Sequence, residues 1–368
     1  MLQRLNNNST LITDIPNPGN IESLAQQWAK KYMQNLQIDI VEEDSQTLTL
    51  SDLVSPFGRQ KTAHKILDSL RSASAKAWNK TEALLSVEVA RHNIHPDHIN
   101  PWEIAGDSFK IYQKVLQVYT QQGITRPLSL VVQLAQEGSQ LNEKALEVYT
   151  QQIAPSQLTT IIGADIGAMR KKYVSSDPRV IGFVSMQFHY TSQMLLEQLD
   201  TLERSLVRAY FKVIDDHLYM PLQRAYEAAA EHDYNSTVLL AVQNLLPVST
   251  QIAQRVCQRV IEMYPNYGSM SGKLSDPEVR ISSIRDVEMF QVYLWVSALE
   301  GNISAIQQEL FPLCVMLYPR LKVHWELIRQ MLHLLGKEIQ ARLTSEQANS
   351  FMPYFQVLPQ MFSPEVFG

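Results

Sequence analysis

The chain has 368 residues, 45% of them hydrophobic and 19% charged, which suits one large globular domain with an extension or two smaller domains. Its net charge of -5 argues against a broad nucleic-acid surface, because neutralising phosphates needs a clear excess of lysine and arginine. No apolar run reaches the roughly 20 residues that cross a bilayer, and residues 1–19 lack the apolar core of a signal peptide. We therefore expect a cytoplasmic protein.

The sequence of the first half of the chain predicts a short lead-in followed by a helical domain. Residues 1–19 are rich in asparagine, proline and threonine and predict a flexible lead-in. Residues 20–176 predict an N-terminal helical domain, in which only QIDIVEEDSQTLTL (37–50) has the alternation of a strand or hairpin. The expected helices are one that opens at residue 20, followed by 59–92, 101–122, 125–136, 139–152 and 155–173.

The second half predicts a further helical domain, over 177–350, after the break at Ser175-Ser176-Asp177-Pro178. Helices are expected from about 183 to 232, with a kink at Pro221. Residues 351–368 hold three prolines and four phenylalanines and predict an extended tail laid on a surface. The fold class is predicted to be all-α. The remaining expected helices are 235–246, 248–264, 277–300, 302–317 and 320–343.

The helix expected over 277–300 is apolar around nearly its whole circumference from Val287 to Leu299. Such a helix must lie at the centre of a large core or an interface. The only two cysteines, Cys257 and Cys314, stand in apolar helical patterns. We expect both to be buried, reduced thiols.

The central helix and the segment that follows it read RDVEMFQVYLWVSALEGNISAIQQELFPLCVMLYPRLKV, residues 285–323. This segment resembles the phycobiliproteins, the globin-like light-harvesting subunits of cyanobacterial phycobilisomes, whose pattern is C-L-R-D-x-E-Y-Y-L-R-Y, A-x-L-A-G-D and E-T-Y-x-x-L-G-V-P. Upstream, Tyr264-Pro265 with Gly268 and Gly272 resembles the family's glycine-rich loop. The residues that match without a gap are Arg285, Asp286, Glu288, Tyr293, Leu299, Gly301, Tyr318, Leu321 and Val323.

The resemblance also shows where the chain departs from the family. A family cysteine, two residues before the arginine, forms a thioether to a linear tetrapyrrole, and Ser283 stands at that position. Because a hydroxyl is a far weaker nucleophile than a thiolate, covalent bilin attachment is not expected. Two family arginines that hold the pigment's propionates correspond to Glu278 and Val279, with Arg280 nearby. An acid at such a position would repel a propionate.

Arg285 and Asp286 remain as candidate cofactor-binding residues. In the family, the arginine pairs with a propionate and the aspartate accepts hydrogen bonds from the pyrrole nitrogens. Two interpretations stay open here. The pair could receive a non-covalent tetrapyrrole, or its charges could be satisfied by each other or by backbone, which we favour because the attachment residues are missing.

The resemblance implies a globin-like C-terminal domain without a covalent cofactor. The sequence holds no recognisable catalytic or metal-binding motif, so we expect a non-catalytic function with no catalytic residues and no metal. We expect an interaction, regulatory or assembly protein of a phycobilisome-related photosynthetic system in cyanobacteria. Its partner would be a protein of the phycobilisome or of a photosynthetic complex, it would form a homodimer, and it would lie in the cytoplasm or at the thylakoid periphery. The alternative is a globin-like sensor that binds bilin or haem non-covalently.

Other polar groupings carry less weight. His92, His95 and His98 carry ligand types that zinc accepts, but Pro96 ends the helix and separates the rings, so a solvated turn is expected. Asp215-Asp216-His217 lacks the Glu-x-x-His pairs of a di-metal bundle. For the proximal histidine of a haem globin, His324 and His333 are available, but they lie late in the chain, well after the central helix.

Overall fold

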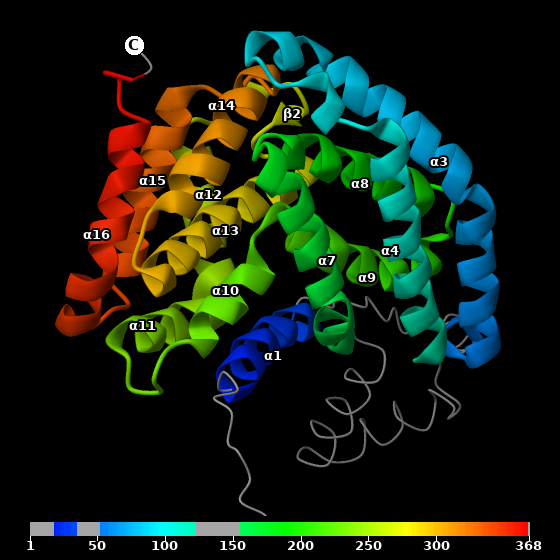
Figure 1. Ribbon diagram of the computed structural model, residues 1–368, viewed down its shortest axis with the longest axis horizontal. Helices are drawn as coiled ribbons and strands as arrows, with labels where there is room; N and C mark the ends of the chain where they lie inside the picture. Colours follow the sequence, from blue (N-terminus) through cyan, green and yellow to red (C-terminus); the bar gives the residue numbers. More distant parts are fainter. Residues whose placement is uncertain (1–17, 35–51, 123–154, 367–368) are drawn as a thin grey trace, which may run out of the picture.

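The computed structural model describes residues 18–34, 52–122 and 155–366, and within these ranges the chain is helical apart from one short hairpin (Figure 1). The prediction of an all-α fold is confirmed. The expected strand or hairpin at 37–50 and the expected helices at 125–136 and 139–152 lie outside the described residues, as does nearly all of the lead-in. None of the helices in the described ranges has the length and apolar character that crossing a membrane requires.

The N-terminal helices are α1 (Pro18–Gln34), α3 (Pro56–Arg91) and α4 (Pro101–Gln121), with a single 3-10 turn at Pro96–His98. Helix α3 starts where the Ser55 hydroxyl accepts a hydrogen bond from the Gly58 N–H at 3.0 Å, and proline fills its first turn, where no N–H is needed. It runs along one edge of the molecule and packs on α8 and α4 (Figure 1).

The middle of the chain forms α7 (Ser156–Ser176), α8 (Val180–Leu196), α9 (Thr201–Tyr219) and α10 (Leu222–Ala230). Helices cover most of 183–232, as expected, but the expected kink at Pro221 is wrong. A new helix begins after Asp200, where the Glu203 side chain accepts a hydrogen bond from the Asp200 N–H, the arrangement of a capping box. Pro221 lacks an N–H and separates α9 from α10, instead of bending one helix.

The next elements lead into the centre of the fold. They are α11 (Thr237–Leu245), a 3-10 turn at Leu246–Val248, α12 (Ser249–Met263), a hairpin of β1 (Gly268–Ser269) and β2 (Gly272–Lys273), and α13 (Pro277–Glu300). Helix α13 has the predicted bounds. It ends at Gly301, whose φ of 67° places it in the left-handed region that favours glycine.

The last elements are a π-helical turn at Ile306–Leu310, α14 (Phe311–Arg320), α15 (Trp325–Gln340) and α16 (Ser345–Met361). The expected extended tail is wrong for residues 351–361, which complete α16. Thr344 and Gln347 cap its start reciprocally. Pro353 and Pro359 lie on its exposed side, whereas the helically spaced Phe351, Phe355, Leu358 and Phe362 are buried. Burial of four large side chains offsets the two hydrogen bonds that the prolines remove.

One continuous cluster of buried apolar side chains extends from α1 to α16. Helix α13 lies between the α15–α16 edge and the α7–α9 region (Figure 1). Every residue from Val287 to Leu299 is buried, which confirms that this helix is central to the core. Trp28 of α1 meets Trp295 of α13 edge to face, with ring centroids 6.1 Å apart, so the N-terminal helix contributes to the same core.

Candidate functional site

The first turns of α13 differ from its buried second half, because Ser283, Arg285 and Asp286 are only partly buried. Both candidate residues contact the same aromatic side chain, Tyr219, at the end of α9. The guanidinium carbon of Arg285 lies 4.4 Å from the centroid of the Tyr219 ring, within the range of a cation–π interaction. The Tyr219 hydroxyl donates a hydrogen bond of 2.9 Å to Asp286 Oδ1.

The hydrogen bonding of Arg285 is incomplete. Its Nε is buried and has no hydrogen-bond partner in the described part of the chain. A guanidinium has five N–H donors in a fixed fork that suits carboxylates, so this side chain keeps unused capacity to bind an anionic group.

Asp286 lies in a poorly hydrated position. Burial raises the pKa of its carboxyl above the ordinary value, although the Arg285 charge and the Tyr219 hydroxyl act in the opposite direction. The carboxylate therefore already has a donor, and a ligand that needs it as an acceptor must share or displace Tyr219.

Two further titratable groups complete what we call the Arg285 cluster: His189 of α8, Asp215 of α9, Tyr219, Arg285 and Asp286. Burial raises the pKa of Asp215 to about 6, opposed by Arg285, and burial together with the Arg285 charge lowers that of His189 to about 3. His189 is therefore neutral at pH 7, and its Nδ1, 4.0 Å from Asp215 Oδ2, forms no ion pair. The two side chains remain 41% and 20% exposed, so water still reaches them among the surrounding protein atoms.

A second charged group, the α1 junction, consists of Lys31, Tyr32, Lys212, Asp216 and Glu288. Lys31 Nζ donates to Glu288 Oε1 at 2.8 Å, with both side chains at most 6% exposed. Lys212 Nζ donates to Asp216 Oδ2 at 2.8 Å, and the Tyr32 hydroxyl donates to the same oxygen at 3.0 Å. Burial alone would raise the pKa of Glu288, but the charges of Lys31 and Lys212 outweigh burial and hold it below its ordinary value.

Ser283 occupies the position where the resemblance places the attachment cysteine. Its Oγ donates a hydrogen bond of 2.8 Å to the backbone oxygen of Val279, so the hydroxyl is directed back along its own helix. Val279 is buried, and Arg280 lines a separate groove with residues of α12. None of these three residues therefore supplies a further positive group to the Arg285 cluster.

The other groupings from the sequence do not converge on one point. Asp215 belongs to the Arg285 cluster and Asp216 to the α1 junction, while His217 lies 2.9 Å from the Val213 oxygen and burial lowers its pKa to about 4. His92 lies 2.9 Å from Glu88. His324 and His333 are exposed. Across residues 18–34, 52–122 and 155–366, no three metal-ligating side chains gather.

The expectation of buried, reduced cysteines is confirmed. Cys257 and Cys314 are both free and buried. Burial raises the pKa of the Cys257 thiol to about 12 and that of Cys314 well above its ordinary value. Both thiols are therefore protonated and unreactive at neutral pH.

Sequence reasoning identified Arg285 and Asp286 but missed the residues around them. Tyr219 lies 67 residues away along the chain, and no local pattern links it to α13. Asp215 stood in the Asp215-Asp216-His217 run, which we interpreted as a weak metal motif. The sequence held one usable signal, because neighbouring residues on a helix point in different directions. Asp215 and Asp216 could therefore be expected to have separate positive partners.

Comparison with known proteins agrees with the resemblance. The family model for phycobilisome proteins matches residues 212–361, a range that holds Asp215, Tyr219, Arg285 and Asp286 but neither His189 nor Lys31. No curated protein and no solved structure matches the chain. Residues 212–361, in the C-terminal half of this all-helical chain, therefore carry a phycobilisome protein domain.

Proposed function

We propose that the protein is a non-catalytic interaction protein, regulatory or assembling, that works with phycobilisomes and carries no covalent bilin. The observation that carries this proposal is Ser283, an alcohol whose hydroxyl is held by the Val279 oxygen at the position where the family has its attachment thiol. The domain matches the family but lacks the cysteine that attaches the pigment. Binding to other proteins is the family function that remains for it.

The packing of α1 supports this proposal. Lys31 and Tyr32 tie the N-terminal helix to α9 and α13 through buried hydrogen bonds, so the two parts of the chain offer partners one continuous surface. We propose a homodimer that docks onto a protein of the phycobilisome, in the cytoplasm or at the thylakoid periphery.

Pigment attachment is tested by co-expressing the protein with the enzymes of bilin synthesis, beside a phycobiliprotein as the positive control. The expected result is no visible absorbance after denaturation and no zinc-induced fluorescence on a denaturing gel. A coloured, fluorescent band at the mass of this chain would contradict the proposal.

Docking is tested by sedimenting the purified protein with isolated phycobilisomes through a sucrose gradient. The expected result is co-sedimentation that saturates with protein concentration. Protein that stays at the top of the gradient at every concentration would contradict docking, whatever the pigment experiment shows.

A second function, non-covalent binding of a tetrapyrrole, is favoured by one observation: the buried Nε of Arg285 has no hydrogen-bond partner in the described ranges. A bilin or haem carries propionates that such a guanidinium can bind. The donor set fits only in part, because Asp286 is already bonded by Tyr219. When bound, the tetrapyrrole would supply visible light absorption, with Arg285 orienting a propionate.

This alternative is tested by titrating biliverdin and haem into the purified protein and recording visible absorbance. A stoichiometric band that Arg285→Ala abolishes, while the thermal midpoint stays within a few degrees, would establish the tetrapyrrole site. Equal spectra for wild type and variant would remove this function.

A further inference from the structure

Helix α12 carries an unusual outer face. Positions 252, 253, 256, 257 and 260 are buried, and the exposed positions between 251 and 262 are occupied entirely by glutamine, arginine and glutamate. The sequence Gln-Arg-Val occurs twice, at 254–256 and 258–260, which repeats the same pair after one helical turn. The exposed residues are Gln251, Gln254, Arg255, Gln258, Arg259 and Glu262.

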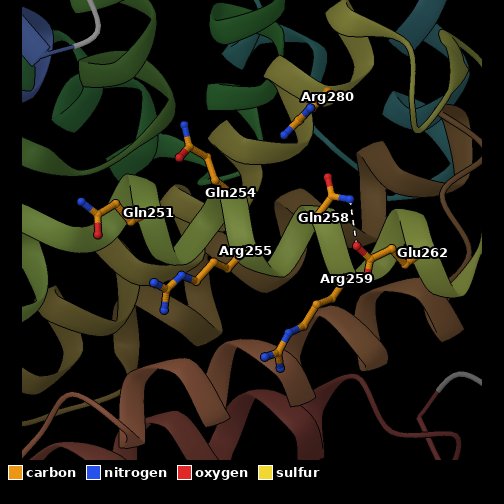
Figure 2. Close-up of a pocket in the computed structure, with 7 residues that line it drawn as sticks. All are labelled: Gln251, Gln254, Arg255, Gln258, Arg259, Glu262 and Arg280. Atoms are coloured by element: carbon orange, nitrogen blue, oxygen red, sulfur yellow. Dashed lines mark hydrogen bonds between the residues drawn. The ribbon is translucent and has the colours of Figure 1, made fainter.

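These residues and Arg280 of α13 line an open groove of about 600 Å³, the α12 groove (Figure 2). In that view Arg255 and Arg259 project from one side of α12, and Arg280 stands beyond the opposite side, which carries Gln254 and Gln258. The groove thus places guanidinium groups on both sides of a row of amides.

The arginines of the groove are weakly paired within the protein. Arg255 and Arg259 are 62% and 53% exposed, and their nitrogens lie 3.8 and 3.9 Å from Glu338. That carboxylate lies closer to Arg342, at 2.8 Å. Exposed contacts at such distances contribute little to stability. The stability of the fold therefore does not explain why Arg255 and Arg259 stand one helical turn apart.

The charge of the groove opposes that of the molecule. Three arginines and one glutamate give a net +2 among its lining residues, whereas the whole chain carries -5. A positive groove on an acidic protein directs an acidic partner to one place, because the rest of the surface repels it.

Exposed apolar side chains stand beside the groove residues. Met263 follows Glu262 and is 49% exposed, and Ile281 follows Arg280 and is 55% exposed. Methionine and arginine are enriched in protein–protein interfaces, where an apolar contact sits beside charged groups.

We propose that the α12 groove docks an acidic helical segment of a protein partner, whose carboxylates pair with Arg255, Arg259 and Arg280. The inference rests on the proposed interaction function and gives that function a surface. Glutamine amides can both donate and accept, which suits a peptide. A phosphate-rich membrane or nucleic acid is less suited, because Glu262 stands in the groove and no lysine lines it.

The test compares a groove variant, Arg255→Glu/Arg259→Glu/Arg280→Glu, with a control of equal charge change at exposed sites elsewhere, Arg71→Glu/Lys76→Glu/Arg208→Glu. The probes are isolated phycobilisomes and a fluorescein-labelled helical peptide with glutamates four residues apart, beside the same peptide with lysines. Circular dichroism and the thermal midpoint establish that each variant is folded.

The groove variant is expected to weaken binding of the glutamate peptide and of phycobilisomes on the order of tenfold or more, with a reduced salt dependence. The control should keep most of the binding. The lysine peptide should not bind.

Each outcome separates the two proposals. If wild type binds phycobilisomes but the groove variant binds equally well, the α12 groove is not the docking site, and the proposed function stands. If the glutamate peptide binds through the arginines but phycobilisomes do not bind, the proposed function fails and the groove stands. Binding to phosphatidylglycerol vesicles through the arginines, without peptide binding, would assign the groove to an anionic surface and overturn the protein partner.

Discussion

The α1 junction and the Arg285 cluster both place charges between helices, but they satisfy those charges differently. In the α1 junction, lysine and carboxylate pairs meet at 2.8 Å, at Lys31–Glu288 and Lys212–Asp216. In the Arg285 cluster, the Arg285 Nε has no partner in the described ranges, and Asp215 comes no closer than 4.0 Å to its histidine neighbour. A complete network fixes how segments fit together, whereas an incomplete one keeps groups available for a ligand or for protons.

The largest expected effect comes from removing one partner of the α1 junction. Lys31→Met leaves Glu288 buried without its cation and should lower the free energy of unfolding by about 3 kcal/mol or more. Urea denaturation followed by circular dichroism measures the change. The matched control is Lys30→Met, one residue earlier on α1 but exposed. Equal midpoints for the two variants would show that the junction does not hold α1.

A pH experiment tests the Arg285 cluster through Asp215, which faces Arg285, Asp216, Lys212 and His189. Its folded pKa of about 6 exceeds the unfolded value near 4, so the folded state holds the proton more tightly. Its contribution to stability is full below about pH 4 and is lost as the pH rises through about 6, by at most about 3 kcal/mol.

The matching variant is Asp215→Asn, which cannot titrate. The free energy of unfolding of wild type minus that of the variant should fall between pH 4 and pH 6.5. The difference is needed because His189 and His217, whose folded pKa values are lowered to about 3 and about 4, make stability rise with pH over the same window. A pH-independent difference would show that Asp215 titrates normally.

A smaller effect is expected for the hydroxyl that links α9 to α13. Tyr219→Phe keeps the ring under Arg285 but removes the hydrogen bond to Asp286, which should cost about 1–2 kcal/mol because a poorly hydrated acceptor loses its donor. Urea denaturation measures it against Tyr354→Phe on α16. A loss no larger than that of the control would mean that Asp286 finds another donor.

The smallest effect is expected for Arg285→Lys. The ammonium keeps the positive charge but loses the planar stack on Tyr219, so the free energy of unfolding should change by less than about 1 kcal/mol. A loss of stability as large as that of Lys31→Met would show that Arg285 is needed for folding, as the charges of the α1 junction are. The Arg285 cluster would then not differ from the α1 junction in this respect.

Much of the fold could be predicted because its helices have strong local signals. Pro277 at the start and Gly301 at the end bounded α13 correctly, and the periodic burial of α12 matched the expected 248–264 closely. The errors arose where local signals misled. The two prolines inside α16 suggested an extended tail, and its helix was decided by burial of phenylalanines against distant helices, which no local window records.

The site could be predicted only as far as the resemblance extended. Arg285 and Asp286 followed from the family pattern, but their contacts are set by tertiary packing. Tyr219 is 67 residues from Asp286, and Lys31 is 257 residues from Glu288. Spacing along one helix reveals which residues share a face, and it does not reveal which other helix meets that face.

The separation between Lys31 and Glu288 also has a consequence for synthesis of the chain. A ribosome adds about 5–20 residues per second, so roughly 13 to 50 s separate the synthesis of Lys31 from that of Glu288, which lies 257 residues later. During that interval Trp28 and Lys31 lack their contacts with α13, and nascent chains stalled before residue 288 should present this helix to chaperones. Helix α1 therefore completes its contacts only after α13 has been made.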